Sequence, residues 1–393
     1  NENIYRMFSV NQIKRTLIPS FACASIYITQ IRKEEENVAF NHLFSANSYR
    51  SILNTLFIKS SCEASSEPRP KLIFLGSGSS TGCPKPLCSL LFGNHFAPRD
   101  NDDDRIKKWK SEMEEDCKIS SLASQGDPIH NKDYRNNPSL LISHTYENER
   151  RNVIFDVGKT FREGALRWMP YHNITSLDAI VLTHEHMDAV GGLDDVRGFQ
   201  YYERTKRETT PVHVYLSKQC YESISKQFHY LVPKPPTKED ENKVKRYVAS
   251  LQYHEIEPFR LFTAAGLEIT PLPVLHGEDL ICMGFSFQLG EKRVVYLSDI
   301  SRMIPETQEY ILKQYASVDL LIIDSLYPDR EHSVHYNLKQ AVALARVLKA
   351  KQTYVLGMNC NAFPTHEVAN ANLRKEYKDD NVQLAHDGLA IEF

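Results

Sequence analysis

One short segment, VLTHEHMDAVGGLDD at residues 181–195, constrains this chain more than any other part of its sequence. An apolar run ends at Thr183, and His184 and His186 follow it two positions apart. If the backbone stays extended there, both imidazoles point to the same side of the chain and can hold one metal ion. Asp188 continues the alternation and adds a carboxylate oxygen, so we predict a metal site that suits zinc, with iron or manganese as alternatives.

Two distant segments repeat this arrangement, in which an apolar run ends at a possible metal ligand. ITPLPVLHGED places His276 at a turn that contains glycine, and RVVYLSDIS places Asp299 at the start of a polar loop. Taken alone, each is more simply explained as a turn histidine or a capping aspartate. Strand ends that meet at one edge of a rigid scaffold bring together residues far apart in the sequence, so we predict that both join the first cluster.

The remaining pattern is typical of a layered α/β protein in which helices cover the sheets. We expect two sheets that face each other, because the apolar, β-branched runs are too many for one small sheet. Helical spacing of apolar residues occurs at 161–169, 216–228 and 337–350. Residues 71–82 are predicted to form a short apolar strand that runs into a Gly/Ser loop, and the other predicted strands are 139–143, 152–156, 178–183, 212–216, 267–274, 293–298, 319–324 and 353–358.

The order of HxHxD, a later lone histidine and then an aspartate after a strand resembles the metallo-β-lactamase superfamily. NVIFDVGKTFREGALRW, THEHMDAVGGLDDVRGF and LAHDGLAI are similar to the branch that includes phosphonate-pathway cyclic phosphodiesterases and transfer-RNA 3′ processing endonucleases. The resemblance runs from about Lys71 to the last residue, apart from a charged insertion at about 94–137. It implies a four-layer αββα sandwich with a metal site at one edge.

The resemblance also implies a role for each candidate residue of the site. A first zinc ion would be held by His184, His186 and His276, and a second by Asp188 and a bridging Asp299. Two ions are expected, with Mn²⁺ or Fe²⁺ as alternatives, and the nucleophile would be metal-bound hydroxide. Asp156, in the strand end FDVG, matches a position that supports the histidines from behind.

The chain departs from the family pattern at two places. Many relatives have a histidine directly after the motif aspartate, where this chain has Ala189. The family also places a ligand histidine in a Thr-His pair after the late strand, where this chain reads GMNCNAFPTHE. Cys360 or His366 would then replace that ligand, or the second metal is weak or missing.

A general acid is needed to protonate the leaving oxygen of a phosphate ester, and REHSVHYNLKQAV offers two histidines. His335 matches the catalytic histidine of the family better than His332, and imidazole transfers protons near neutral pH. A histidine at a helix start with no catalytic role explains the position equally well. We predict His335 as the acid and Asp188 as a further residue of the catalytic site.

The formal net charge of −3 provides no strong nucleic-acid signal and favours a small phosphate ester as the substrate. Hydrolysis of thioesters or other acyl compounds is an alternative on the same fold. A non-catalytic binding protein is another, supported by the altered GMNCNAFPTHE segment. An oligomer is possible.

The N-terminal residues 1–67 are polar and end in a Ser/Pro-rich stretch, so we expect an extension and linker before a hydrolase domain at 68–393. Eight scattered cysteines indicate reduced thiols and an intracellular, cytoplasmic protein, although residues 16–31 could act in targeting. Cys83 and Cys88 are expected to be two loop thiols. No run approaches the roughly 20 apolar residues that cross a membrane.

Overall fold

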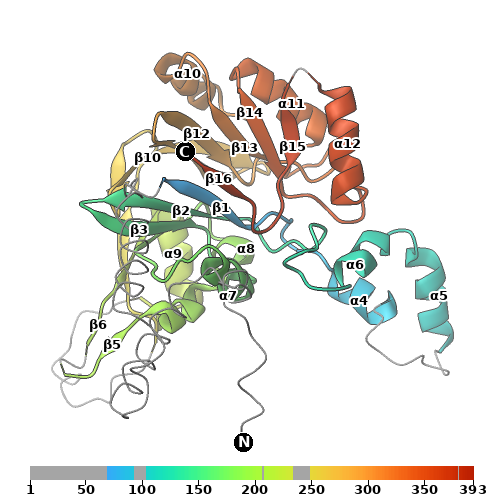
Figure 1. The fold of residues 1–393 in the computed structure, drawn as a ribbon, viewed down its shortest axis with the longest axis horizontal. Coiled ribbons are helices and arrows are strands. Elements are labelled where there is room, and N and C mark those ends of the chain that lie inside the picture. Colours follow the sequence, from blue (N-terminus) through green and yellow to red (C-terminus); the bar gives the residue numbers. More distant parts are fainter. Residues whose placement is uncertain (1–68, 93–102, 206–207, 233–247, 379) are drawn as a thin grey trace, which may run out of the picture. The chain divides into compact units, whose positions relative to one another are not determined.

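The computed structural model describes residues 69–92, 103–205, 208–232, 248–378 and 380–393 (Figure 1). The chain divides into two units, 1–66 and 67–393, and the fold below is that of the second unit. The predicted extension at 1–67 and the possible targeting segment at 16–31 lie outside the described residues. Among the described helices, none has both the length and the apolar character needed to cross a membrane.

Two seven-stranded sheets form the centre of this unit. In each sheet, four strands pair in antiparallel fashion and the others continue the sheet in parallel. The order in the first sheet is β16 (Ala390–Glu392), β1 (Lys71–Gly76), β2 (Ser139–Tyr146), β3 (Glu149–Phe155), β4 (Ala179–Val181), β7 (Val212–Leu216) and β8 (Leu251–Glu255). The order in the second is β15 (Val382–Leu384), β14 (Gln352–Leu356), β13 (Leu320–Asp324), β12 (Lys292–Leu297), β11 (Leu280–Leu289), β10 (Leu267–His276) and β9 (Phe262–Ala264). A separate short ribbon joins β5 (Tyr202–Glu203) and β6 (Glu208–Thr209).

The two sheets pack face to face, and helices cover their outer faces. Alternate residues of a strand point to opposite faces, so Phe74 of β1 lies in the core between the sheets while Leu75 packs under the helices. Phe155 contacts aromatic rings of the opposite sheet, with its ring centre 5.4 Å from that of Phe285 and 5.7 Å from that of Tyr296. These layers confirm the predicted αββα sandwich.

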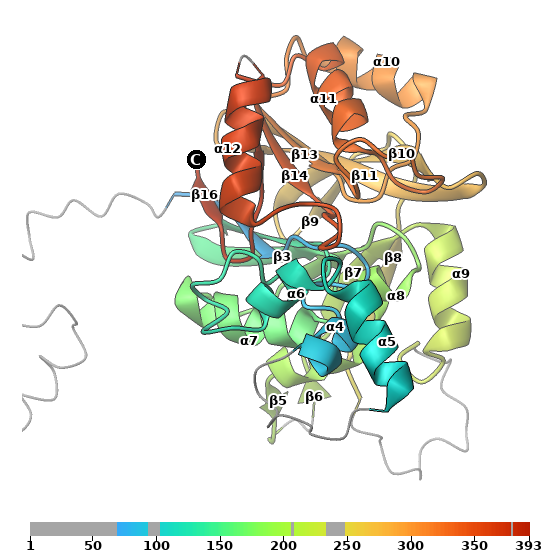
Figure 2. The same cartoon turned by 90° about the vertical axis from the view of Figure 1, so that its right-hand side faces the viewer.

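The first sheet is covered by α7 (Phe161–Tyr171) and α9 (Lys218–Gln227), and the second by α10 (Pro305–Gln314), α11 (Leu338–Val347) and α12 (His366–Glu376) (Figure 2). The start of α11 is fixed by a capping box: the Asn337 side chain accepts a bond from the Gln340 backbone N–H, and the Gln340 side chain accepts one from the Asn337 backbone N–H. The loop before this helix therefore has a defined end, and that loop carries His335.

Part of the charged insertion is more regular than its sequence indicates. Its described residues form α5 (Asp104–Met113) and α6 (Lys118–Ala123), and α4 (Pro86–Phe92) precedes them. The Asp103 side chain caps α5, which buries none of its residues and is therefore solvated but helical, whereas α6 buries Ile119, Ser120 and Ala123. Cys88 lies in α4, so only Cys83 of the expected loop thiols is in a loop.

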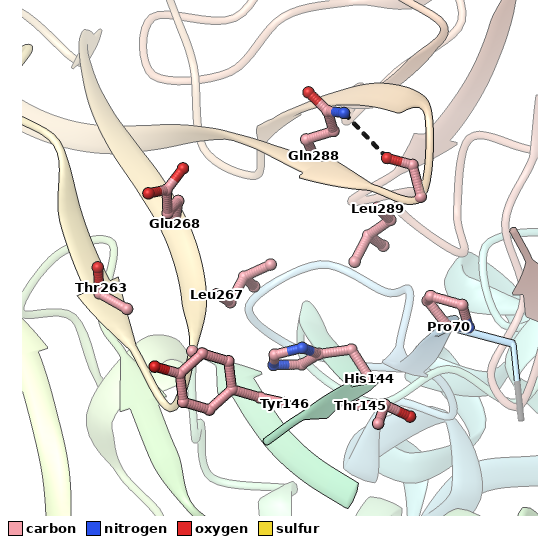
Figure 3. Close-up of a pocket in the computed structure, with 11 residues that line it drawn as sticks. Pro70, His144, Thr145, Tyr146, Thr263, Leu267, Glu268, Gln288 and Leu289 are labelled. Carbon is pink, nitrogen blue, oxygen red and sulfur yellow. Dashed lines mark hydrogen bonds between the residues drawn. The ribbon is translucent and has the colours of Figure 1, made fainter. Parts of the chain in front are cut away.

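A pocket of about 540 Å³ opens between β2 and the turns that join β9 to β10 and β11 to β12 (Figure 3). His144 and Tyr146 of β2 line it together with Leu267 and Glu268 of β10. Its lining contains none of the residues predicted to form the metal site.

Candidate metal centre

The predicted site residues lie where strands of both sheets end. Asp156 follows β3, and His184 comes three residues after β4, in the first sheet. His276 is the last residue of β10, and Asp299 comes two residues after β12, in the second. The described residues contain two groups whose possible ligand atoms lie within 4.8 Å of one another: His184, His186 and His276 form one, and His276, Asp299 and His335 form the other.

His184 is held in one orientation by Thr183 and Asp156. The Oδ1 atom of Asp156 accepts a bond of 2.9 Å from the Thr183 amide, and Oδ2 accepts one of 2.8 Å from the Thr183 hydroxyl. The Thr183 hydroxyl donates its only proton to Asp156. The Nδ1 atom of His184 lies 2.8 Å from the Thr183 hydroxyl oxygen, so Nδ1 must carry a proton and donate it to that oxygen. The lone pair of neutral His184 is therefore on Nε2, the atom that a metal would bind.

Asp156 lies behind His184, where the family resemblance implies a supporting residue, and it contacts His184 only through Thr183. Its backbone φ of 62° lies in the left-handed region, which is uncommon for a residue other than glycine and frequent at functional sites. Burial raises the pKa of the Asp156 carboxyl, and the two bonds from Thr183 oppose that effect. The ionised carboxylate is the form that accepts both bonds.

His276 is fixed in the same way by a backbone carbonyl. Its Nδ1 lies 2.8 Å from the carbonyl oxygen of Val334, and a carbonyl only accepts, so Nδ1 carries the proton and Nε2 carries the lone pair. The ring centres of His184, His186 and His276 are 4.7 to 5.3 Å apart. His186 is the exposed member of this cluster, whereas His184 and His276 are buried.

The histidine cluster fits a divalent ion in its chemistry. The Nε2 atom of His184 is buried and has no hydrogen-bond partner among the described residues, although such an atom is costly to leave unpaired. Burial lowers the pKa of His184 to about 3, helped by the nearby His276 and His186 and opposed by Asp299. The ring is therefore neutral at pH 7, as a metal ligand must be.

The two aspartates of the predicted second metal site differ in their surroundings. Asp299 is buried, and burial raises the pKa of its carboxyl. The surrounding imidazoles, led by His184 and His335, lower that pKa by more, so the net shift is downward. Burial raises the pKa of Asp188, and the negative charge of Asp299 adds to that rise. Two buried carboxylates that repel each other in this way favour a cation between them.

The extended alternation predicted through Asp188 is wrong. The backbone becomes helical at α8 (Met187–Val190), with His186 as its N-cap, so only the two histidines lie on an extended segment. The Asp188 carboxyl still interacts electrostatically with Asp299 and His186. Its oxygens belong to neither of the two close groups among the described residues. Its role as a ligand and catalytic residue remains a prediction.

His335 lies beside the histidine cluster, and the residue that orients it was not predicted. Its ring centre is 4.9 Å from that of His276, and its Nδ1 is 2.7 Å from Oδ2 of Asp324 and 3.7 Å from Oδ1 of Asp299. Burial lowers the pKa of His335, but Asp324 and Asp299 outweigh that effect and raise it to about 9. Asp324 ends the strand DLLIID, and this strand-end aspartate was the available signal for it.

The two candidate replacement ligands lie among other partners. The Sγ atom of Cys360 is 3.2 Å from the Ser120 hydroxyl, in a small buried cluster with Cys83. The Nε2 atom of His366 is 2.9 Å from the side-chain nitrogen of Asn370. Neither Cys360 nor His366 belongs to the close groups found among the described residues.

Comparison with known proteins identifies the family of this chain. Residues 151–358 match the model of the β-lactamase superfamily domain. A curated octanoyltransferase of Porphyromonas gingivalis is 27% identical over 321 residues, which are 81% of this chain and 51% of that protein, so this chain spans about half of its length. A solved structure described as a new diphosphatase from the PhnP family is 27% identical, with a TM-score of 0.57 over 83% of this chain and 97% of the other. Zinc-bound PqqB from Methylobacterium extorquens shares the fold, with 15% identity and a TM-score of 0.55 over 82% of this chain and all of that one. Because the family model covers more than half of the chain, this protein belongs to the β-lactamase superfamily and has the metallo-β-lactamase fold.

Proposed function

We propose that this protein is a metal-dependent hydrolase of small phosphodiesters. The observation that carries the proposal is the convergence of His184 and His276, each with Nδ1 held as a donor and Nε2 left for a metal, beside a histidine that is paired with a carboxylate. A metal centre next to a possible general acid is the combination that phosphate ester hydrolysis requires. The 27% identity to a described diphosphatase supports the same substrate chemistry.

His184, His186 and His276 would hold the first ion, with Asp299 beside them and Asp188 as the predicted further ligand. A bound zinc ion supplies a Lewis acid for a phosphoryl oxygen and lowers the pKa of a water molecule. Thr183 and Asp156 keep the Nε2 atom of His184 directed at that ion, because a rotated ring would break a buried hydrogen bond.

His335 is the residue that protonates the leaving oxygen in this proposal. Asp324 holds its Nδ1 proton, so the proton that moves is the one on Nε2. The carboxylate also stabilises the charged ring before the transfer, which keeps His335 protonated near neutral pH. An alkoxide is a poor leaving group, so this proton contributes most to esters of weakly acidic alcohols.

The name of the curated relative favours a second candidate, acyl chemistry on the same site. That name describes a protein of which this chain covers 51%, so the acyl activity has to be tested directly on this chain. The zinc-loaded protein would be assayed on bis(p-nitrophenyl) phosphate and on an octanoyl thioester, each with and without a chelator.

Chelator-sensitive turnover of the phosphodiester, with little or none of the thioester, is the expected result. Turnover of the thioester alone would replace the proposal with acyl hydrolysis. Absence of both activities after loading with zinc and with manganese would leave the binding-protein alternative.

A further inference from the structure

An exposed lysine, Lys159, packs against the short helix that carries Asp188. It follows the loop FDVG, three residues after Asp156. A Cβ atom at Gly191, the C-cap residue of α8, would lie only 3.1 Å from the Cγ atom of Lys159, so the stem of the lysine lies against the end of this helix. The side chain is therefore held beside the segment from which Asp188 comes.

The ammonium group of Lys159 is oriented by a backbone carbonyl. Its Nζ atom donates a bond of 2.8 Å to the carbonyl oxygen of Ser80, in the Gly/Ser loop after β1. The side chain of Asn137 donates to the same oxygen over 2.9 Å and to the carbonyl oxygen of Ser79 over 3.1 Å, so the loop is itself fixed. A carbonyl orients an ammonium group but does not neutralise its charge.

The charge of Lys159 has no carboxylate partner within ion-pair distance in the part of the chain that the structure describes. The next acidic residue along the chain, Glu163 of α7, lies close enough to Tyr134 to act on it electrostatically. The carboxyl group on which Lys159 acts is that of Asp188. Burial raises the pKa of Asp188, and His186 and Lys159 oppose that rise.

The surroundings of the metal centre make a nearby cation useful to an anionic substrate. Asp188, Asp299 and Asp324 are all buried there, and carboxylates that bound ions do not neutralise would repel a phosphodiester. Lysine is a compact point charge on a flexible stem. The Nζ atom of Lys159 can therefore exchange the Ser80 carbonyl for a substrate oxygen, while the contact with α8 keeps it beside the centre.

We propose that Lys159 determines a preference of the metal centre for anionic substrates, because its ammonium group binds a non-bridging oxygen of the phosphodiester. This inference rests on the proposed hydrolase function. The bond to a non-bridging oxygen does not break in the reaction, so Lys159 acts on substrate binding. Cleavage of the ester bond is left to the metal centre and to His335. A neutral ester presents no such anionic oxygen.

The test measures kcat and KM of the zinc-loaded full chain on bis(p-nitrophenyl) phosphate at low and at high sodium chloride concentration. Lys159→Met should raise KM about fivefold at low salt and change kcat little, the effect of one exposed charge. Lys159→Arg should keep the wild-type KM. High salt should bring the wild-type KM close to that of Lys159→Met, because salt screens an exposed charge.

Two further measurements separate a binding role from a structural one. Methyl bis(p-nitrophenyl) phosphate is a neutral triester with the same leaving group, and Lys159→Met should leave its kcat/KM unchanged. Zinc content per chain, measured by elemental analysis, should be equal in the wild type and in Lys159→Met.

Lys313→Met is the matched control, since Lys313 is an exposed lysine in the last turn of α10. The end of α10 lies beside the start of β12, where the Arg293 side chain donates to the Gln314 carbonyl. Asp299 follows the other end of β12, so Lys313 is distant from the metal centre along that strand. This control should keep the wild-type KM at both salt concentrations.

Four results would overturn the inference, and they are distinguishable. If Lys159→Met keeps the wild-type KM, or if Lys313→Met raises KM equally, the phosphodiesterase stands and Lys159 does not set its preference. If Lys159→Arg has the KM of Lys159→Met, the charge is not what binds the substrate. If Lys159→Met loses zinc, or loses kcat on diester and triester alike, its role is structural. If the wild type hydrolyses neither ester, the proposed function fails and the inference fails with it.

Discussion

The Nδ1 atom of His335 lies 2.7 Å from the Oδ2 atom of Asp324, and this contact joins a loop histidine to the last residue of a buried strand. The carboxylate fixes the ring and leaves the opposite nitrogen to face the site. An imidazole oriented in this way is able to act as an acid, whereas a histidine that only begins a helix needs no buried carboxylate.

Asp324→Asn should therefore slow esters with poor leaving groups much more than activated ones. We expect a loss of about 100-fold in kcat on diphenyl phosphate, a typical contribution of a general acid, and a much smaller loss on bis(p-nitrophenyl) phosphate. His335→Ala should show the same difference between the two esters. Equal slowing of both esters in the two variants would show that His335 is not the acid.

Thr183→Val should weaken zinc binding by roughly 10- to 100-fold, because it removes the hydroxyl that connects Asp156 to His184. The affinity would be measured by competition with a chromophoric chelator. Thr353→Val is a matched control, since the Thr353 hydroxyl is also buried in a strand but has no partner among the described residues. Equal affinities of the two variants would contradict the positioning role of Thr183.

Gly158→Ala should lower Tm by several degrees and reduce metal loading. A Cβ atom at this position would lie 1.9 Å from the backbone oxygen of Asp188, so the segment that carries Asp188 would have to move. Gly198→Ala is the control, because a Cβ atom there meets nothing within 4 Å. The idea is wrong if thermal scans and elemental analysis do not separate the two variants.

Asp319 makes a contribution to stability that should depend on pH. Its backbone bond from Arg293, followed by the bond from Lys351, lowers the pKa of the Asp319 carboxyl. A carboxyl with a depressed pKa in the folded state stabilises the protein above its unfolded pKa, near 4, and this stabilisation is lost as the pH falls through the folded pKa.

Asp319→Asn should accordingly lower Tm by roughly 2 to 4 °C at pH 7 and have little effect near pH 2.5. Glu309→Gln, at an exposed carboxylate of α10, is the control and should change Tm little at either pH. A pH-independent effect of Asp319→Asn would mean that the charge of Asp319 does not contribute.

The sequence predicted the layers because buried strands such as β13 are short runs of apolar residues that alternate between two cores. It also predicted His184 and His186 as a pair, since an extended segment needs only local geometry. Local reasoning was wrong at Asp188, where the chain enters α8 directly after His186. An alternation of only three ligand-type residues, His184, His186 and Asp188, could not show that a four-residue helix begins at Met187.

Contacts between distant segments were beyond reach of the sequence. The Asp324–His335 pair spans 11 residues and the Asp156–Thr183 contact spans 27, and each depends on how strands and loops meet in space. The surroundings of Cys360 likewise depend on Ser120, which belongs to the charged insertion. No pattern in one sequence shows that an insertion folds back onto a distant loop.

The most direct test of the metal centre compares zinc content per chain and turnover of bis(p-nitrophenyl) phosphate in the wild type and in His186→Ala. His186 is exposed, so its removal should leave the fold intact, which circular dichroism would verify. The account predicts that His186→Ala binds one zinc ion fewer than the wild type and loses turnover. Wild-type zinc content together with wild-type turnover in His186→Ala would contradict it.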